Sequence, residues 1–218
     1  MPILKNVKRG YRSPLRAEQA RQTRRRILDA AQRLFLDLGY PATSVEAIAA
    51  AAKVSPDTVY TTFGSKRNLV KQLMDVVVGG DDSDLKVLDR REPQSVRQER
   101  DQRVQLAAFA AGISVRIEAA RPLDDVLRGA AEVDAEVRAL RDDIQLRQRR
   151  AAMSTVAEWL AANGPLRDGI AVSDAASMLW TLTSPEVHRL LRDECGWSHE
   201  RFVLWLEDTL VRTLLPDL

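Results

Sequence analysis

Apolar side chains recur at helical spacing along most of this chain, and no segment shows the sustained alternation that indicates a β-strand. The first clear apolar stripe lies between Ala17 and Leu38, and Gly39 follows it as a residue suited to ending a helix. The members of the stripe are Ile27, Leu28, Ala31, Leu34, Phe35 and Leu38. We therefore predict an amphipathic helix over 17–38, preceded by a flexible basic arm over 1–16.

A short second helix is predicted to end near Ala52. Thr43 and Glu46 have the spacing of a capping box, with Thr43 as the N-cap. Val45, Ile48, Ala49 and Ala52 then form its apolar face, and the small alanines allow another helix to approach closely.

Two more helices begin after serines. Ser55 is followed by Pro56, a residue that is best tolerated at the first position of a helix, and the pattern continues to Phe63. Ser65 is the expected N-cap of the next helix, over 66–78. Three helices with a tight turn between the second and the third are the components of a helix-turn-helix.

The second half of the chain shows longer helices after a polar linker over 79–95. Pro122 is expected to end the first of them, and Asn163-Gly164-Pro165 is a strong stop signal later on. The predicted spans are 96–120, 123–133, 134–162, 174–183, 185–194 and 198–215. The prediction is an all-α protein with an N-terminal three-helix helix-turn-helix DNA-binding domain over 17–78 and a C-terminal helical bundle over 96–218 for ligand binding and dimerisation.

Charge is distributed unevenly along the 218 residues. The formal net charge is only +2, but residues 1–75 hold 14 basic and 6 acidic side chains, a balance of +8, which leaves −6 for the remainder. Such asymmetry indicates a polyanion, either nucleic acid or an anionic membrane surface, as the partner of the basic half. Basic residues are mostly arginine, which fits phosphate recognition and equally fits a GC-rich coding sequence.

The third helix presents hydroxyl groups on its outer face. Val59 and Phe63 are one turn apart and fall on the inner face. The outer face then holds Thr58, Tyr60, Thr61 and Thr62. Hydroxyls and a tyrosine suit the major groove of DNA, where they reach phosphates, base edges and thymine methyl groups.

At this point the sequence resembles the TetR family of transcriptional regulators. The resemblance covers about residues 20–80. It rests on Ile27-Leu28-Asp29-Ala30-Ala31, Leu34-Phe35, Gly39-Tyr40, Thr43 to Ala49, Val54-Ser55, Thr58 to Phe63 and Gly64-Ser65-Lys66. The terminal pattern from Trp180 to Val187 is seen in one branch of the family. Lys53 departs from the family, which usually has glycine in this turn, and a left-handed backbone there costs about 1 kcal/mol.

The resemblance implies roles for individual residues. Phosphate contacts are expected from Thr43, Ser44, Tyr60, Thr62 and Lys66. Contacts to bases or to their rim are expected from Ser55, Pro56, Asp57, Thr58 and Thr61. Asp57 either accepts a hydrogen bond from a cytosine amino group or complements the helix N-terminus, and we favour the second role.

A cluster of arginines opens the first helix. Taken alone, the cluster Arg24, Arg25 and Arg26 is most simply a group of charged side chains that face solvent. Beside a helix-turn-helix, the same cluster favours phosphate or minor-groove contact. We therefore include Arg24 and Arg25 among the candidate DNA-binding residues.

The last helix is apolar on nearly all sides, so both faces need partners. One face is expected to pack on its own domain and the other on a second copy of the chain. The four-helix dimer seam usual in the family agrees with a homodimer and a near-palindromic operator. The candidate interface residues are Val187, Leu190, Leu191, Phe202, Trp205, Leu206 and Leu210.

The resemblance also implies a ligand cavity among the middle helices. Its candidate walls are Phe109, Ile113, Arg116, Trp159, Met178 and Trp180, for which plain core packing is the simpler alternative. Arg116 pairs either with an acidic ligand or with Glu118 or Asp125. The ligand itself is unknown.

The remaining chemistry is sparse. His188 and His199 are expected at the surface or in an interface, and Cys195 is expected to be a small buried side chain. We expect neither metal nor cofactor, because one cysteine and two histidines supply no metal cluster. The hypothesis that the protein is an enzyme is disfavoured, because the sequence spacing singles out no pair of nucleophile and base. A single cysteine also fits a reducing cytoplasm, and we expect a bacterial cytoplasmic protein.

The sequence thus predicts a dimeric, sequence-specific DNA-binding regulator. The leading hypothesis is a repressor that a small-molecule effector releases from a palindromic operator. The alternatives are a helical interaction protein and a DNA-binding regulator without ligand gating.

Overall fold

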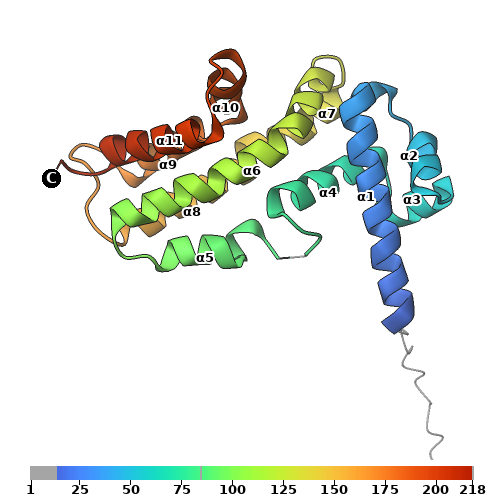
Figure 1. The fold of residues 1–218 in the computed structure, drawn as a ribbon, viewed down its shortest axis with the longest axis horizontal. Coiled ribbons are helices and arrows are strands. Elements are labelled where there is room, and N and C mark those ends of the chain that lie inside the picture. Colours follow the sequence, from blue (N-terminus) through green and yellow to red (C-terminus); the bar gives the residue numbers. More distant parts are fainter. Residues whose placement is uncertain (1–13, 84, 218) are drawn as a thin grey trace, which may run out of the picture.

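A computed structural model describes residues 14–83 and 85–217, and these residues are helical with no β-strand among them (Figure 1). The N-terminal head consists of α1 (Pro14–Ala42), α2 (Val45–Ala52) and α3 (Pro56–Phe63), and α4 (Lys66–Gly79) runs from the head toward the body. Within the described residues, every helix is too short or too polar to span a lipid bilayer.

The body contains all the later elements. They are η1 (Val87–Asp89), α5 (Arg91–Gln98), α6 (Gln102–Ala131), α7 (Ala135–Asp142), η2 (Asp143–Gln148), α8 (Arg149–Ala161), α9 (Val172–Leu182), α10 (Pro185–Arg189), η3 (Leu190–Glu194) and α11 (His199–Leu214). α6 crosses the molecule diagonally, and α7 lies at the end of the body that is nearest to α1 (Figure 1).

Helix α1 is longer than its apolar stripe predicts. It begins at Pro14, so residues 14–16 of the expected arm are helical, while 1–13 lie outside the described residues. Gly39 has a φ of 80° and breaks the regular helix, as predicted from its position after Leu38. A short helical stretch continues past this kink to Ala42.

The N-cap of α2 is Ser44, so the prediction of Thr43 as the N-cap was wrong. The Ser44 side chain accepts a hydrogen bond from the Ala47 backbone N–H at 3.0 Å. Thr43 is fully buried instead, and its hydroxyl donates toward the backbone carbonyls of Leu34 and Gly39. Thr43 therefore fastens the start of α2 to the end of α1.

The other capping predictions in the head are confirmed. Ser55 and Ser65 are the N-caps of α3 and α4, and Pro56 occupies the first turn of α3. Lys53 adopts φ 56° and ψ 48°, the left-handed conformation that its place in the turn suggested.

The expected linker over 79–95 contains structure. The turn η1 and the start of α5 lie within it, and Pro93 and Val96 are the buried residues of α5. Helix α5 is otherwise polar, so apolar periodicity gave little sign of it.

Pro122 does not end a helix, contrary to the prediction. Helix α6 continues through it from Gln102 to Ala131. The apolar residues on both sides of the proline are buried, including Ile117 and Leu123. Packing of both halves thus outweighs the backbone hydrogen bond that a proline cannot donate.

The helix predicted over 134–162 is one helical run with an irregularity. Asp134 is its N-cap, as predicted. Between α7 and α8, residues 143–148 form the π-helical segment η2. A second π-helical segment, η3, continues α10. Such segments are common at functional sites.

The buried apolar side chains form two clusters. The first, which we call the head core, joins Ile27, Ile48 and Phe63 of the head to Leu123 and Leu127 of α6. Val137 and Leu140 of α7 belong to the same cluster. The second, the body core, unites α5, α6, α8, α9 and α11. The head is therefore packed directly on one end of α6.

Candidate nucleic-acid interface and ligand cavity

Helix α3 buries one face and exposes the other. Val59 and Phe63 are 2% and 1% exposed, and they hold α3 in the head core. Tyr60 is 47% exposed and Thr61 is also exposed. This division is the one that the sequence predicted for a recognition helix.

Several hydroxyls on α3 have partners within the helix. Ser55 Oγ accepts from the Thr58 backbone N–H and lies 2.9 Å from Thr58 Oγ1. Thr62 Oγ1 donates to the Thr58 carbonyl at 2.7 Å. Tyr60 and Thr61 therefore provide the most prominent groups of the exposed face.

The first turn of α3 is open to solvent. Pro56 and Asp57 are both exposed, and Asp57 is the acidic residue of that turn. This position agrees with a carboxylate that complements the positive end of the helix dipole. It also leaves Asp57 accessible to DNA.

Two of the residues that were expected to contact phosphate, Thr43 and Lys66, have side chains that turn inward. Thr43 has no exposed surface, so its hydroxyl does not face the DNA side, whereas neighbouring Ser44 is exposed. Lys66 is half-buried, and its ammonium donates to the carbonyls of Tyr40 at 2.9 Å and Thr43 at 3.0 Å. It also lies 4.1 Å from the centre of the Tyr40 ring, and burial lowers the pKa of Lys66. Lys66 thus joins α4 to the end of α1.

Arg24 is also engaged within the protein. Its Nε lies 3.0 Å from both carboxylate oxygens of Asp82, and Nη1 donates to the Gln72 side chain. The guanidinium carbon lies 5.0 Å from the centre of the Phe63 ring, at the end of α3. Arg24 therefore connects α3, α4 and the loop after α4, whereas Arg25 is exposed. Asp82 lies 58 residues away in sequence, where no local pattern reveals it.

A cavity of about 1060 Å³ lies between α4, α5, α6 and α8. Phe109, Ile113, Arg116 and Trp159 all line it, where the sequence placed ligand-binding walls. Met178 and Trp180 are not among its lining residues, so those two assignments do not hold in this structure. They pack against the body core, and the Trp180 indole donates to the Gln145 carbonyl at 2.9 Å.

Arg116 has a different partner from those expected. It forms an ion pair with Glu92 of α5, not with Glu118 or Asp125. Residues 79–95 were expected to form a linker, so Glu92 was not considered as a partner for Arg116.

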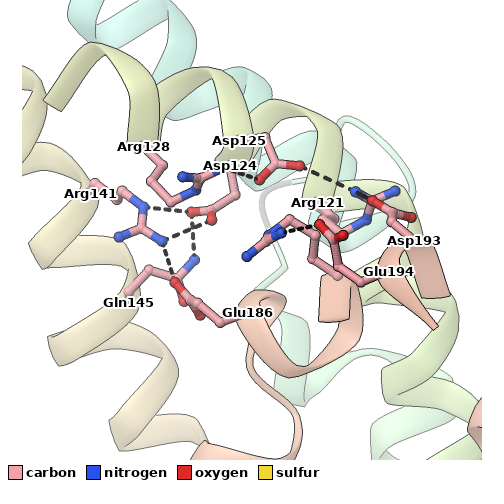
Figure 2. Close-up of polar contacts among 10 residues, drawn as sticks. Arg121, Asp124, Asp125, Arg128, Arg141, Gln145, Glu186, Asp193 and Glu194 are labelled. Carbon is pink, nitrogen blue, oxygen red and sulfur yellow. Dashed lines mark hydrogen bonds and ion pairs between the residues drawn. The ribbon is translucent and has the colours of Figure 1, made fainter. Parts of the chain in front are cut away.

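A polar network that includes Asp124 and Gln145 borders the cavity (Figure 2). Asp124 is 2% exposed and lines the cavity. Its two oxygens accept hydrogen bonds from Arg141 at 3.1 and 3.0 Å, and Gln145 Nε2 donates to the same carboxylate at 2.9 Å. Arg141 also pairs with Glu186 of α10 at 2.6 Å. The network links α6, α7, η2 and α10.

The apolar residues of α11 divide between two faces. Phe202, Leu206 and Leu210 are completely buried in the body core, so they pack within the chain and are wrong as dimer contacts. Trp205 and Leu191 are half-buried against the same core, and Val187 is also half-buried. Leu204 is 65% exposed and Leu190 is 48% exposed. The free apolar surface is therefore on the Leu204 side of α11.

A charged cluster attaches α6 to the last helices. Glu118 accepts from Arg192 through both oxygens, at 3.1 and 3.2 Å, and it lies 2.9 Å from His188 Nε2. The arginine holds the pKa of Glu118 at about 2. His188 is completely buried within the chain, contrary to the expected position at the surface or in an interface, and burial lowers its pKa. Cys195 is exposed, although burial was expected.

Comparison with known proteins identifies the head. Residues 27–73 match the family model for bacterial regulatory proteins of the tetR family. A segment of 54 residues is 44% identical to YvkB of Bacillus subtilis (strain 168), an uncharacterized HTH-type transcriptional regulator. That match covers 25% of this chain and 29% of YvkB, so it spans less than a third of the relative.

Solved structures share the fold over nearly the whole chain. NalD, the secondary repressor of the MexAB-OprM multidrug efflux pump in Pseudomonas aeruginosa, superposes with a TM-score of 0.69 at 24% identity and covers 91% of this chain and 100% of NalD. A regulator from Saccharomonospora viridis in complex with choline gives a TM-score of 0.64 at 19% identity, over 89% of this chain and 98% of that one. Residues 27–73 are thus similar to the tetR family of bacterial regulatory proteins, and the chain as a whole shares the fold of solved regulators.

Proposed function

We propose that this protein is a dimeric transcriptional repressor that leaves a palindromic operator when a small organic molecule enters its cavity. One observation carries the proposal: Met74, Asp75 and Val76 of α4 line the cavity, and α4 directly follows the recognition helix. A ligand in the cavity therefore touches the helix that positions the DNA-reading surface.

The DNA-facing role falls on the exposed side of the head. Tyr60 and Thr61 enter the major groove on α3, with Ser55, Pro56 and Thr58 at the rim. Ser44 and Arg25 are exposed and suited to phosphate contacts. Lys66, Thr43 and Arg24 act indirectly, because they hold the elements that carry this surface.

Gating follows from the contacts of α4. Arg24 connects the end of α3 to Gln72 of α4 and to Asp82, and all three of Arg24, Gln72 and Asp82 border the cavity. A ligand that displaces α4 changes the angle of the head relative to the body. Release of DNA requires the ligand to bind this altered state more tightly than the DNA-bound state.

A second copy of the chain sets the spacing of the two heads. The exposed Leu204 and Leu190 provide an apolar surface for a symmetric contact between copies. Two heads held in this way read half-sites about one DNA turn, ~34 Å, or a multiple apart. NalD, with the same fold, is described as a repressor, and the Saccharomonospora viridis neighbour holds a small molecule, which supports both parts of the proposal.

Selection of bound sequences from random DNA tests DNA reading. The expected result is an inverted repeat, with an affinity that falls steeply as salt increases. Y60A should weaken operator binding at least tenfold, while T181A, which alters an exposed threonine on α9, should leave it unchanged. Recovery of no common sequence would contradict the proposal.

Gating is tested by adding small molecules to the operator complex. A compound that binds the free protein and weakens operator affinity supports release. If compounds that occupy the cavity leave operator affinity unchanged, the protein is a DNA-binding regulator without ligand gating.

A further inference from the structure

The α8 side of the cavity has an apolar stretch and a polar end. Phe109 and Ile113 of α6 face it together with Met153, Val156 and Trp159 of α8. Toward the head, the same α8 side of the cavity continues to Arg149 and to Gln145 of η2. An occupant that matches this wall has an apolar body and one polar group.

Arg149 is a half-buried arginine without a carboxylate partner among the described residues. Its Nη2 donates to the Trp180 carbonyl and to Thr183 Oγ1, the latter at 3.1 Å. The guanidinium carbon lies 5.5 Å from the centre of the Trp180 ring. These contacts fix the side chain and leave Nε and Nη1 to donate to another group.

The other arginines of the cavity wall are different. Arg24 pairs with Asp82, Arg90 with Asp81 and Arg116 with Glu92. Arg97 is exposed and lies over Trp159. Arg149 is therefore the half-buried arginine of this wall that has no ion pair among the described residues, and it can gain most from an anionic partner.

The nearest carboxylates do not form an ion pair with Arg149. Asp124 and Glu186 act on Arg149 through their charge, but both form their ion pairs with Arg141. Burial still lowers the pKa of Arg149 to about 10. Gln145 Oε1 is a buried acceptor without a hydrogen-bond partner in the described residues, and a carboxylate, which is also an acceptor, does not satisfy it.

We propose that the effector is an organic acid whose carboxylate binds Arg149 and whose apolar body lies along Met153, Val156 and Trp159. This inference rests on the proposed function, because it names the chemistry of the ligand that acts there. A carboxylate accepts two hydrogen bonds from a guanidinium, and such charge-assisted bonds are about twice as strong as neutral ones. Arg149 supplies the positive charge for the carboxylate, and the cavity volume permits a drug-sized body.

Three probes with the same ten-carbon chain test the charge preference. Decanoate, decan-1-ol and decyltrimethylammonium are titrated into the DNA-free, full-length protein by calorimetry, below their aggregation concentrations. Decanoate should bind at least tenfold more tightly than the cation and more tightly than the alcohol. Absence of decanoate binding, or equal binding of the three probes, would overturn the proposal.

Variants locate the site. R149Q should weaken decanoate at least tenfold and change decanol less than twofold. R149K keeps the charge but not the paired donors of the guanidinium, so it should weaken decanoate less than R149Q does. R150Q alters the exposed neighbouring arginine and should have no effect. Equal weakening of decanoate and decanol in R149Q would overturn the assignment. If R149Q does not fold, as a thermal melt would show, the probe series on the unaltered protein still decides.

A separate titration distinguishes this inference from gating. Decanoate that binds through Arg149 but does not release the operator refutes gating and leaves the acid site in place. Release of the operator by decanol and the cation, but not by decanoate, refutes the acid site and leaves gating in place.

Discussion

At the scale of single residues, Lys53 shows how backbone conformation affects stability. Its left-handed φ of 56° places a β-carbon where glycine would have none. We expect K53G to raise the free energy of unfolding by about 0.5–1 kcal/mol, measured by chemical denaturation. K53A keeps the β-carbon and should give no such gain, and equal gains in both variants would contradict the explanation.

Buried His188 makes stability dependent on pH. Burial lowers the pKa of its imidazole below the ordinary value of 6.5, although Glu118 opposes the shift. Arg121 and Arg192 also disfavour the protonated form. Below about pH 6.5 the unfolded chain binds a proton that the folded chain excludes, so stability falls as pH decreases. Thermal melts from about pH 8 to about pH 5 should show this fall.

Replacement of the histidine isolates its contribution. H188Q should flatten the part of the decline that begins below about pH 6.5. At lower pH a second decline belongs to Glu118, whose pKa is about 2 instead of 4.5. The stability that its carboxylate provides is complete above pH 4.5 and is lost as pH falls toward 2. The same decline in H188Q as in the natural protein would contradict this account.

Residue roles were predictable where the relevant partner is close in sequence. Ser55 and Ser65 cap helices that begin at the next residue, so local spacing was sufficient. The partners of Arg24 and Arg116 lie on distant segments, and the charge of each residue alone did not select them. Thr43 differed because the serine beside it satisfies the cap equally well.

At the scale of elements, the Asp124 network holds four helical segments together (Figure 2). R141M would leave the buried Asp124 carboxylate without its charged partner. We expect a loss of about 3 kcal/mol or more in the free energy of unfolding, because removing one member of a buried pair leaves the other charge buried without a partner. Chemical denaturation measures this loss.

Arg147 provides a matched control on the same helical run. It pairs with Asp143, but its side chain is 80% exposed. R147M should therefore cost less than about 1 kcal/mol. Comparable losses in R141M and R147M would show that Asp124 is not the source of the effect.

Element boundaries followed from periodicity except where packing overrides a local signal. Pro122 is a strong breaker in sequence, but apolar residues on both sides of it are buried, and α6 continues. The two apolar faces of α11 were evident from spacing alone. The position of α6 decides which face of α11 packs inside, and the spacing of residues along the sequence does not give that position.

At the scale of the whole molecule, Leu204 is the expected centre of the dimer contact. L204E would place a charge in an apolar interface, at a cost of several kcal/mol. We expect it to convert the dimer to a monomer in sedimentation experiments at micromolar concentration and to weaken operator binding strongly. L146E alters a leucine that is 53% exposed on η2 and should remain dimeric. A dimeric L204E would refute this surface.

The head core has a consequence for protein engineering. Ile27, Ile48 and Phe63 share one cluster with Leu123, Leu127 and Val137, so the head has no complete core without α6 and α7. A fragment that ends after α4 would expose this apolar surface to water and is expected to aggregate. A chimaera that joins this head to another sensor domain should therefore carry the second half of α6 and α7 along with the head.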